Sequence, residues 1–256
     1  MHLSSLLHAI SMATALLLTS ATVRAQSASD LMGSGDVFDR KFQAGKALEY
    51  YLPAEKLEPQ NVPLLVRIAR QYRHLMTDAT TSAEKLRLGG SALSYGRRAA
   101  ALAPNDSEAQ LSPAITYGKM LPFQGTREQV DASPRIKAAA DKALKLDQRN
   151  DVAWHVLGRW HQALANIGVL KRTLGGLIYG KLPTSTNEAA VACFDQAIAI
   201  NPNRLRHYIE LGRTYAQMGR TDEARKFITQ GMAMPNKEHD DPELKERGRL
   251  ALAKLP

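Results

Sequence analysis

Few of the residue types that perform catalysis or bind metals occur in a usable arrangement. Cys193 is the single cysteine, so neither an intramolecular disulfide nor a cysteine-based zinc site can form, and the spacing of its neighbours favours a core residue. His155 and His161 stand six residues apart, a poor spacing for two ligands of one metal on a helix. The run 239–241 (His-Asp-Asp) contains ligand types, but Asp241 precedes Pro242, which is typical of a helix N-cap. We expect no catalytic residue, no metal site and no cofactor.

Arginine and other polar side chains recur at helical spacing in several segments of the chain. The planar guanidinium group of arginine donates two hydrogen bonds at once to a carboxylate or a phosphate. If one surface collected these side chains, it would bind an acidic or phosphate-bearing ligand. The set consists of Arg70, Arg73, His74, Lys119, His155, Arg159, Gln162, Arg206, Arg213 and Gln217. The alternative is that these side chains form a solvated face or pair with acids from segments inserted between the repeat helices.

The helices that would position this set follow from an internal repeat. In the clearest unit, small and aromatic residues recur at the spacing of two packed helices. They are Ala190, Phe194, Ala197 and Pro202, then Tyr208, Leu211, Gly212 and Tyr215, then Ala224, Ile228 and Gly231. Small residues let two helices approach closely, aromatic residues fill the space between them, and the proline lies past a helix end. This is the tetratricopeptide pattern.

The same frame recurs along the chain, in five units that begin near residues 28, 62, 107, 151 and 205. A charged final helix over residues 243–255 suits a solubilising cap. Extra residues around 77–90, 123–134 and 166–187 extend three units as longer helices or loops. The sequence therefore predicts an all-α fold, a tetratricopeptide-repeat α-solenoid of about five helix pairs plus a C-terminal capping helix. In such a stack the first helices line a concave groove, which would collect the arginine-rich set.

Residues 1–25 have the features of a secretory signal. The apolar run over residues 9–18 is too short to span a bilayer as a helix, and small residues occupy the −3 and −1 positions before Gln26. We expect cleavage before Gln26, a tetratricopeptide-repeat domain over residues 26–256, and an exported protein in the periplasm or outside the cell. An uncleaved anchor is the alternative, because no Lys or Arg precedes the apolar run.

The longest stretch between repeat helices contains an uncharged, glycine-rich run. Its apolar side chains are Leu174, Leu177, Ile178 and Tyr179. One interpretation is a loop that contacts lipid or covers a ligand. The other is a segment folded onto the stack, with glycines that permit close packing.

The charge balance restricts the chemistry of a partner. The chain of 256 residues has a formal net charge of +9 and a pI near 9.7. Such an excess favours an acidic protein or peptide partner, with anionic phospholipid as a second class. Nucleic acid is not expected, because the basic residues are not interleaved with enough aromatic residues for a stacking platform. A hydrophobic fraction of 44% fits neither a disordered chain nor a multi-span membrane protein.

Particular segments resemble a known family. They are Arg67-Ile68-Ala69-Arg70, Gly158-Arg159-Trp160, Lys171-Arg172, Gly180-Lys181-Leu182-Pro183 and Leu211-Gly212-Arg213-Thr214-Tyr215. Over roughly residues 36–255 the chain resembles the regulator of microtubule dynamics family, as an exported bacterial-type member. The resemblance implies a helical-repeat fold without catalytic residues. Animal members of that family are associated with microtubules, and one member at the outer mitochondrial membrane tethers partner proteins and binds phospholipid.

Two functions are compatible with these observations. The first is a non-catalytic interaction scaffold that binds an acidic protein segment or peptide in an arginine-rich concave groove. The alternative is a phospholipid-binding, lipid-transfer or tethering protein at an envelope membrane. Because an exported protein does not meet cytoplasmic filaments, we carry over the fold of the family and not its microtubule association.

Overall fold

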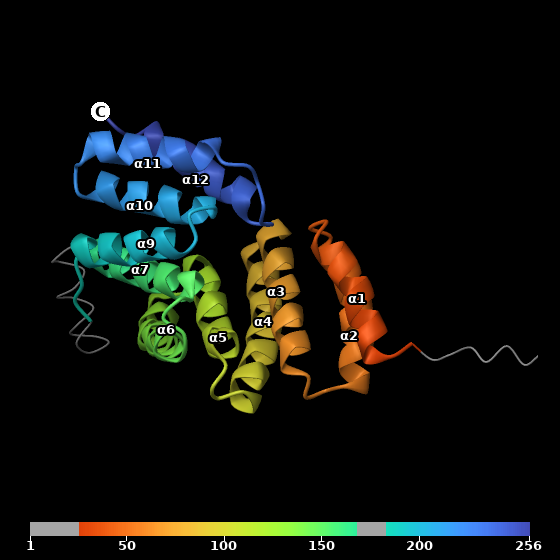
Figure 1. Cartoon of the computed structure of the whole chain (residues 1–256). Helices are drawn as coiled ribbons and strands as arrows, with labels where there is room; N and C mark the ends of the chain where they lie inside the picture. The colour runs from red at the N-terminus through yellow and green to blue at the C-terminus, as the bar shows by residue number, and fades with distance from the viewer. Residues whose placement is uncertain (1–25, 168–182) are drawn as a thin grey trace, which may run out of the picture.

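The computed structural model describes residues 26–167 and 183–256, and over these ranges the chain forms helices and no β-strand. The helices are α1 (Ala28–Asp39), α2 (Ala44–Leu57), α3 (Val62–Asp78), α4 (Ser82–Leu102), α5 (Ser107–Met120), α6 (Thr126–Leu146), α7 (Asp151–Ala165), α9 (Asn187–Ile200), α10 (Leu205–Gln217), α11 (Thr221–Ala233) and α12 (Asp241–Leu252). Helices pack in pairs, α1 with α2, α3 with α4, α5 with α6, α7 with α9 and α10 with α11 (Figure 1). The predicted all-α solenoid of five helix pairs is confirmed.

Three of these pairs are closed by a glycine that meets a large side chain of the other helix. Tyr51 of α2 is fully buried, and a Cβ added at Gly35 of α1 would lie 2.4 Å from its ring. Phe194 of α9 lies against Gly158 of α7 in the same way, at 2.8 Å from the added Cβ. In the last pair the added Cβ at Gly212 would lie 2.8 Å from a backbone nitrogen of α11. Any larger residue would therefore force these helices apart.

Trp154 and Tyr208 occupy equivalent positions in successive units. Each is the fourth residue of its helix, Trp154 in α7 and Tyr208 in α10. The Trp154 indole donates to the carbonyl of Gln148 and the Tyr208 hydroxyl donates to the carbonyl of Pro202, each at 3.0 Å and each six residues upstream. The same contact thus ties both helices to the turn that precedes them.

In three repeat units, an asparagine or aspartate precedes the first helix and caps its N-terminus. The side chains of Asn61, Asp106 and Asn150 accept from the backbone N–H three residues later, at 3.1, 2.8 and 2.9 Å. Each bond satisfies an N–H group that has no partner inside the helix. The beginnings of α3, α5 and α7 are therefore set by local chemistry.

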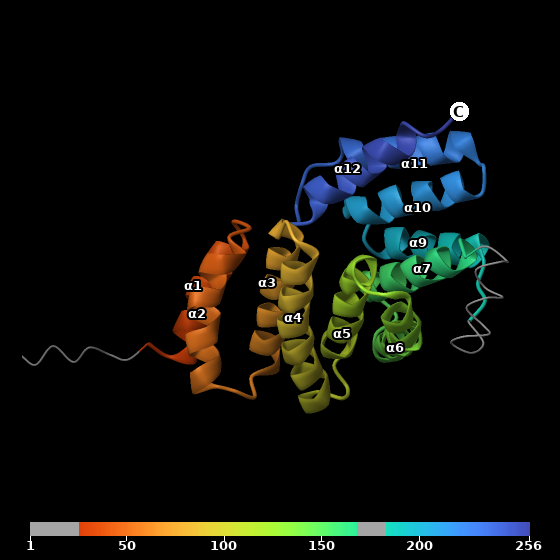
Figure 2. The same cartoon turned by 180° about the vertical axis from the view of Figure 1, so that it is seen from behind.

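The stack bends so that its last helices come back toward its first ones. Helices α1 to α5 run side by side, whereas α7, α9, α10 and α11 lie across them (Figures 1 and 2). The connection between α11 and α12 then reaches the end of α3, where Asp240 accepts from Thr77 and His239 contacts Asp78. We call residues 236–240 of this connection the returning segment.

The final helix differs from its prediction. It spans Asp241–Leu252 instead of 243–255, and it packs on α10 and α11 through Leu244 and Gly248. The prediction that Asp241 is the N-cap is wrong. Asp241 lies in the first turn, and its Oδ2 accepts from the backbone N–H groups of Lys237 and Glu238 at 2.7 and 2.8 Å. The Asp241 carboxylate therefore binds the two backbone N–H groups of the returning segment and does not cap the helix that follows it.

Two of the three extra stretches are largely helical. The stretch around 77–90 lengthens α3 and α4, and the stretch around 123–134 follows a short 3-10 helix, Leu121–Phe123, and begins α6. Most of the third lies outside the described residues, and so do its apolar side chains Leu174, Leu177, Ile178 and Tyr179. The predicted secretory signal over 1–25 also lies outside them. In residues 26–167 and 183–256, no helix has the length and apolar character to cross a membrane.

Candidate functional site

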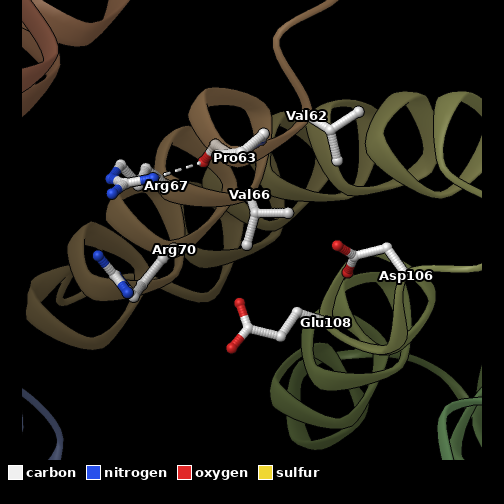
Figure 3. Close-up of a pocket in the computed structure, with 7 residues that line it drawn as sticks. All are labelled: Val62, Pro63, Val66, Arg67, Arg70, Asp106 and Glu108. Atoms are coloured by element: carbon white, nitrogen blue, oxygen red, sulfur yellow. Dashed lines mark hydrogen bonds between the residues drawn. The ribbon is translucent and has the colours of Figure 1, made fainter. Parts of the chain in front are cut away.

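Helices α3, α5, α7 and α10 contact one another in series and form an inner wall of the stack. At one end of this wall a cleft opens between α3 and the start of α5 (Figure 3). Its lining residues are Val62, Pro63, Val66, Arg67, Arg70, Asp106 and Glu108. Figure 3 shows Val66 between the arginines of α3 and the two acids at the start of α5, with Val62 above Asp106. An apolar strip flanked by opposite charges suits a chain segment with mixed side chains.

The arginines of the cleft pair with acids of the first unit. Arg67 Nε donates to Asp36 Oδ1 at 2.9 Å, and Arg70 pairs with Asp39. These arginine side chains remain 31% and 43% exposed. Because both side chains are partly exposed, an incoming carboxylate would compete with Asp36 and Asp39 for them.

Arg73 lies deeper in the wall and has no carboxylate partner. It is 6% exposed, and its Nη1 donates to the hydroxyls of Ser112 and Thr116 at 3.2 and 3.3 Å. Among the described residues no acid lies within ion-pair distance of it. Burial lowers the pKa of Arg73 to about 10, and the positive charge of Arg70 acts in the same direction. Arg73 is therefore a buried cation held by hydroxyl groups alone.

The returning segment inserts two carboxylates between cations of the wall. Lys119 Nζ of α5 lies 2.7 Å from Asp240 Oδ2, and Thr77 of α3 donates to Asp240 Oδ1 at 2.9 Å. Glu238 pairs with Arg204 at 2.7 Å and with Arg206. Burial alone would raise the pKa of Asp240, but the charge and hydrogen bond of Lys119 hold it below its ordinary value. Asp240 is thus ionised at neutral pH.

Beside Asp240, aromatic rings from the α1–α2 connection, from α3 and from the returning segment contact one another. The rings of His74 and His239 stack with centroids 4.5 Å apart, and Phe42 meets His239 edge-on at 6.2 Å. His239 Nε2 also lies 2.8 Å from Asp78 Oδ1. Burial lowers the pKa of His74 to about 3, so this ring is neutral. Phe42, in the connection between α1 and α2, has a φ of 59°, which is uncommon for a residue with a side chain.

A second group of the predicted side chains surrounds one buried acid. Glu210 is 1% exposed and pairs with Arg159 and, at 2.7 Å, with Arg213. Gln162 donates to the Glu210 carbonyl at 3.2 Å and to Thr214 Oγ1 at 2.9 Å. Burial would raise the pKa of Glu210, but Arg159 and Arg213 hold it below its ordinary value. The two arginines therefore neutralise an internal charge.

His155 belongs to a buried chain of hydrogen bonds. His207 Nε2 lies 2.9 Å from Asp151 Oδ2, and His207 Nδ1 lies 3.1 Å from His155 Nδ1. Burial lowers the pKa of both rings, so we assign both as neutral. His207 then donates to Asp151 and accepts from His155. These hydrogen bonds join α7, which carries Asp151 and His155, to α10, which carries His207.

The structure divides the predicted arginine-rich set into separate groups. Around the returning segment lie Arg73, His74, Lys119 and Arg206. Around Glu210 lie Arg159, Gln162 and Arg213. The cleft is lined by Arg70. Gln217 is exposed at the end of α10, apart from both groups. His161 is also separate from His155, since it contacts Ser185.

Sequence reasoning missed the acids that meet these cations. They are Glu210, Glu238 and Asp240. For Glu210 a signal existed, because Arg213 follows it by three residues on the same helix face. For Glu238 and Asp240 the signal was only a cluster of acids between two helices.

Known proteins resemble this chain over most of its length. The family model described as regulator of microtubule dynamics protein 1-3 matches residues 31–256. Regulator of microtubule dynamics protein 1 of Bos taurus is 25% identical over 209 residues, which cover 80% of this chain and 66% of that protein. Regulator of microtubule dynamics protein 2 of Bos taurus is 23% identical over 175 residues, covering 68% and 43%. The chain thus spans less than two thirds of the length of these two relatives.

A solved structure shares the fold. A thermophilic tetratricopeptide-repeat protein of Thermus thermophilus superposes with a TM-score of 0.62 at 18% identity, covering 89% of this chain and 100% of that chain. This likeness concerns the path of the backbone.

Proposed function

The chain belongs to the regulator of microtubule dynamics family, and from that premise we propose that it is a non-catalytic scaffold that binds a protein or peptide segment on the concave face of its repeats. The observation that carries this proposal is the cleft between α3 and α5 (Figure 3). Its apolar strip, Val62 and Val66, would bury apolar side chains of a bound segment, and its charged edges would fix the direction of that segment. Several other cations of the wall already have acid partners within the chain, as Arg159 and Arg213 do in Glu210.

An acidic partner is favoured by the charges that remain accessible. Arg67 and Arg70 are partly exposed although each contacts an acid, and the chain has a formal net charge of +9. The opposite edge of the cleft carries Glu108, which is exposed and has no ion pair among the described residues. A segment with acidic residues toward α3 and a basic residue toward α5 would match both edges.

Export is part of the proposal. The features of residues 1–25 favour a working protein in the periplasm or outside the cell, where it would serve a partner other than cytoplasmic filaments. Mass spectrometry of the protein from its own cells should find Gln26 as the first residue. A mature chain that begins at Met1 would contradict cleavage.

Site-specific photo-crosslinking in the native cells tests the concave face. A benzophenone amino acid at Val66, inside the cleft, should yield a discrete crosslinked protein, whereas one at Ser94, exposed on α4 and not part of the cleft, should not. Crosslinks to phospholipid alone at Val66 would favour the lipid-binding alternative over this proposal. Equal crosslinking at both positions would mean that the cleft has no special role.

A further inference from the structure

The returning segment has the form of a bound peptide. It contains neither helix nor strand, and side chains make its contacts with the wall. Glu238 is held by Arg204 and Arg206 at the start of α10. Asp240 is held by Lys119 of α5 and Thr77 of α3. One short stretch of chain is thus bound by side chains from three helices, as a ligand of a concave groove would be.

The wall has more donors than the segment uses. Arg73 donates only to hydroxyl groups, although it is buried. The Nε atoms of Arg70 and Arg206 are buried and have no acceptor among the described residues. Buried donors without acceptors cost free energy. A ligand with additional acceptor atoms would therefore satisfy this wall better than Glu238 and Asp240 do.

One side of the segment is open to solvent. A shallow depression lies beside the connection between α9 and α10. Its lining residues are Asn201, Asn203, Arg204, Leu205, Lys237, Glu238 and Asp241. The Glu238 side chain is 27% exposed and that of Arg204 is 24% exposed. A competing carboxylate can reach this ion pair from solvent.

We propose that the returning segment is an internal ligand of the concave groove, and that the partner displaces it with an acidic segment of its own. The inference rests on the proposed function and specifies the partner. Its segment carries two carboxylates at the spacing of Glu238 and Asp240, one for the arginine pair of α10 and one for Lys119. Because an internal ligand acts at a high effective concentration, a partner gains by also occupying the α3–α5 cleft.

The test uses the segment itself as the probe. A fluorescein-labelled peptide with the sequence of residues 236–242 is titrated into the full chain and into the double variant Glu238→Gln/Asp240→Asn. Both substitutions keep the side-chain shape and remove the competing charges. We expect the peptide to bind the double variant at least about tenfold more tightly than the natural chain, because a larger fraction of grooves is open. Fluorescence anisotropy gives both Kd values.

Matched controls separate this inference from general charge attraction. A peptide with Gln and Asn at the positions of Glu238 and Asp240 should bind neither protein, and adding Lys119→Met to the double variant should remove the gain. Equal affinity of the acidic peptide for the natural chain and the variant would overturn the inference, and so would equal binding of the neutral peptide. If the double variant fails to fold by circular dichroism, the single variant Asp240→Asn is held to the same criteria.

The two proposals can fail separately. Peptide binding without a protein crosslink at Val66 would support the internal ligand and contradict the scaffold function. A protein crosslink at Val66 without peptide binding would support the scaffold and overturn the internal ligand.

Discussion

Lys119 and Asp240 lie 121 residues apart in the sequence, yet the Lys119 ammonium nitrogen is 2.7 Å from Asp240 Oδ2. The two side chains are only 22% and 19% exposed. Burial lowers the pKa of Lys119, although the charge of Asp240 opposes this shift. The pair joins α5 to the returning segment, and through it the third repeat unit to the end of the fifth. This ion pair therefore connects two repeat units that are not neighbours in the stack.

Helix crossings should be sensitive to single methyl groups. In Gly212→Ala the new Cβ would lie 2.8 Å from the backbone nitrogen of Ile228, so we expect a loss of about 1–3 kcal/mol in the free energy of unfolding. Gly118→Ala is the matched control, because nothing lies within 4 Å of its Cβ. It should stabilise α5 by about 0.5–1 kcal/mol. Urea denaturation measures both, and equal effects would contradict the close approach at Gly212.

The two arginines around Glu210 should be needed for folding. In Arg159→Met/Arg213→Met the Glu210 carboxylate, 1% exposed, loses both ion pairs, and we expect a cost of about 3–5 kcal/mol. Arg249→Met removes an exposed pair with Glu246 and should leave the denaturation midpoint unchanged. A double variant as stable as the natural chain would show that Glu210 is not buried. Charge reversal at Arg159 and Arg213 is consequently a poor probe of ligand binding.

The free energy of unfolding should fall as the pH decreases from 7 to 5. Burial lowers the pKa of His155 and His207, so in this window the unfolded chain binds protons that the native protein does not. Each such histidine contributes a slope of up to about 1.4 kcal/mol per pH unit. Denaturation at several pH values measures the slope, and His155→Gln should reduce it. A flat profile, or one that rises toward pH 5, would contradict neutral buried rings.

The Cys193 thiol should be inert in the native protein. It is 6% exposed, and burial raises its pKa to about 11, so little thiolate exists at pH 8. A disulfide reagent such as DTNB should react slowly with the native chain and at once in denaturant. Complete reaction of the native protein within the mixing time would place Cys193 outside the core.

The fold could be predicted because its signals act between neighbouring helices. Ala47, Tyr51 and Ala54 have no exposed surface, and the spacing that buries them is the spacing visible in the sequence. The same holds for Trp154 and Tyr208, whose equivalent positions come from one repeat frame. Each of these contacts depends on one helix and its partner.

The site was predicted only in part because its contacts depend on the whole stack. Repeat position alone predicts that Arg70, Arg73 and Lys119 lie on the inner wall. Each repeat unit is rotated relative to the one before it, and the sum of these rotations decides which acids contact the three cations. The contact of Thr77 with Asp240, for example, joins residues 163 positions apart. No local pattern encodes that distance. Single-sequence reasoning therefore identified the cations of the wall and missed the chain segment that lies against them.

A double-mutant cycle on Lys119 and Asp240 tests the central claim, that the returning segment lies against the inner wall. The free energies of unfolding are measured for the natural chain, Lys119→Met, Asp240→Asn and the double variant. If the two side chains form the partly buried pair described here, their coupling energy should exceed about 1 kcal/mol. Additive effects within about 0.3 kcal/mol would mean that the segment and α5 do not touch, and would contradict the account.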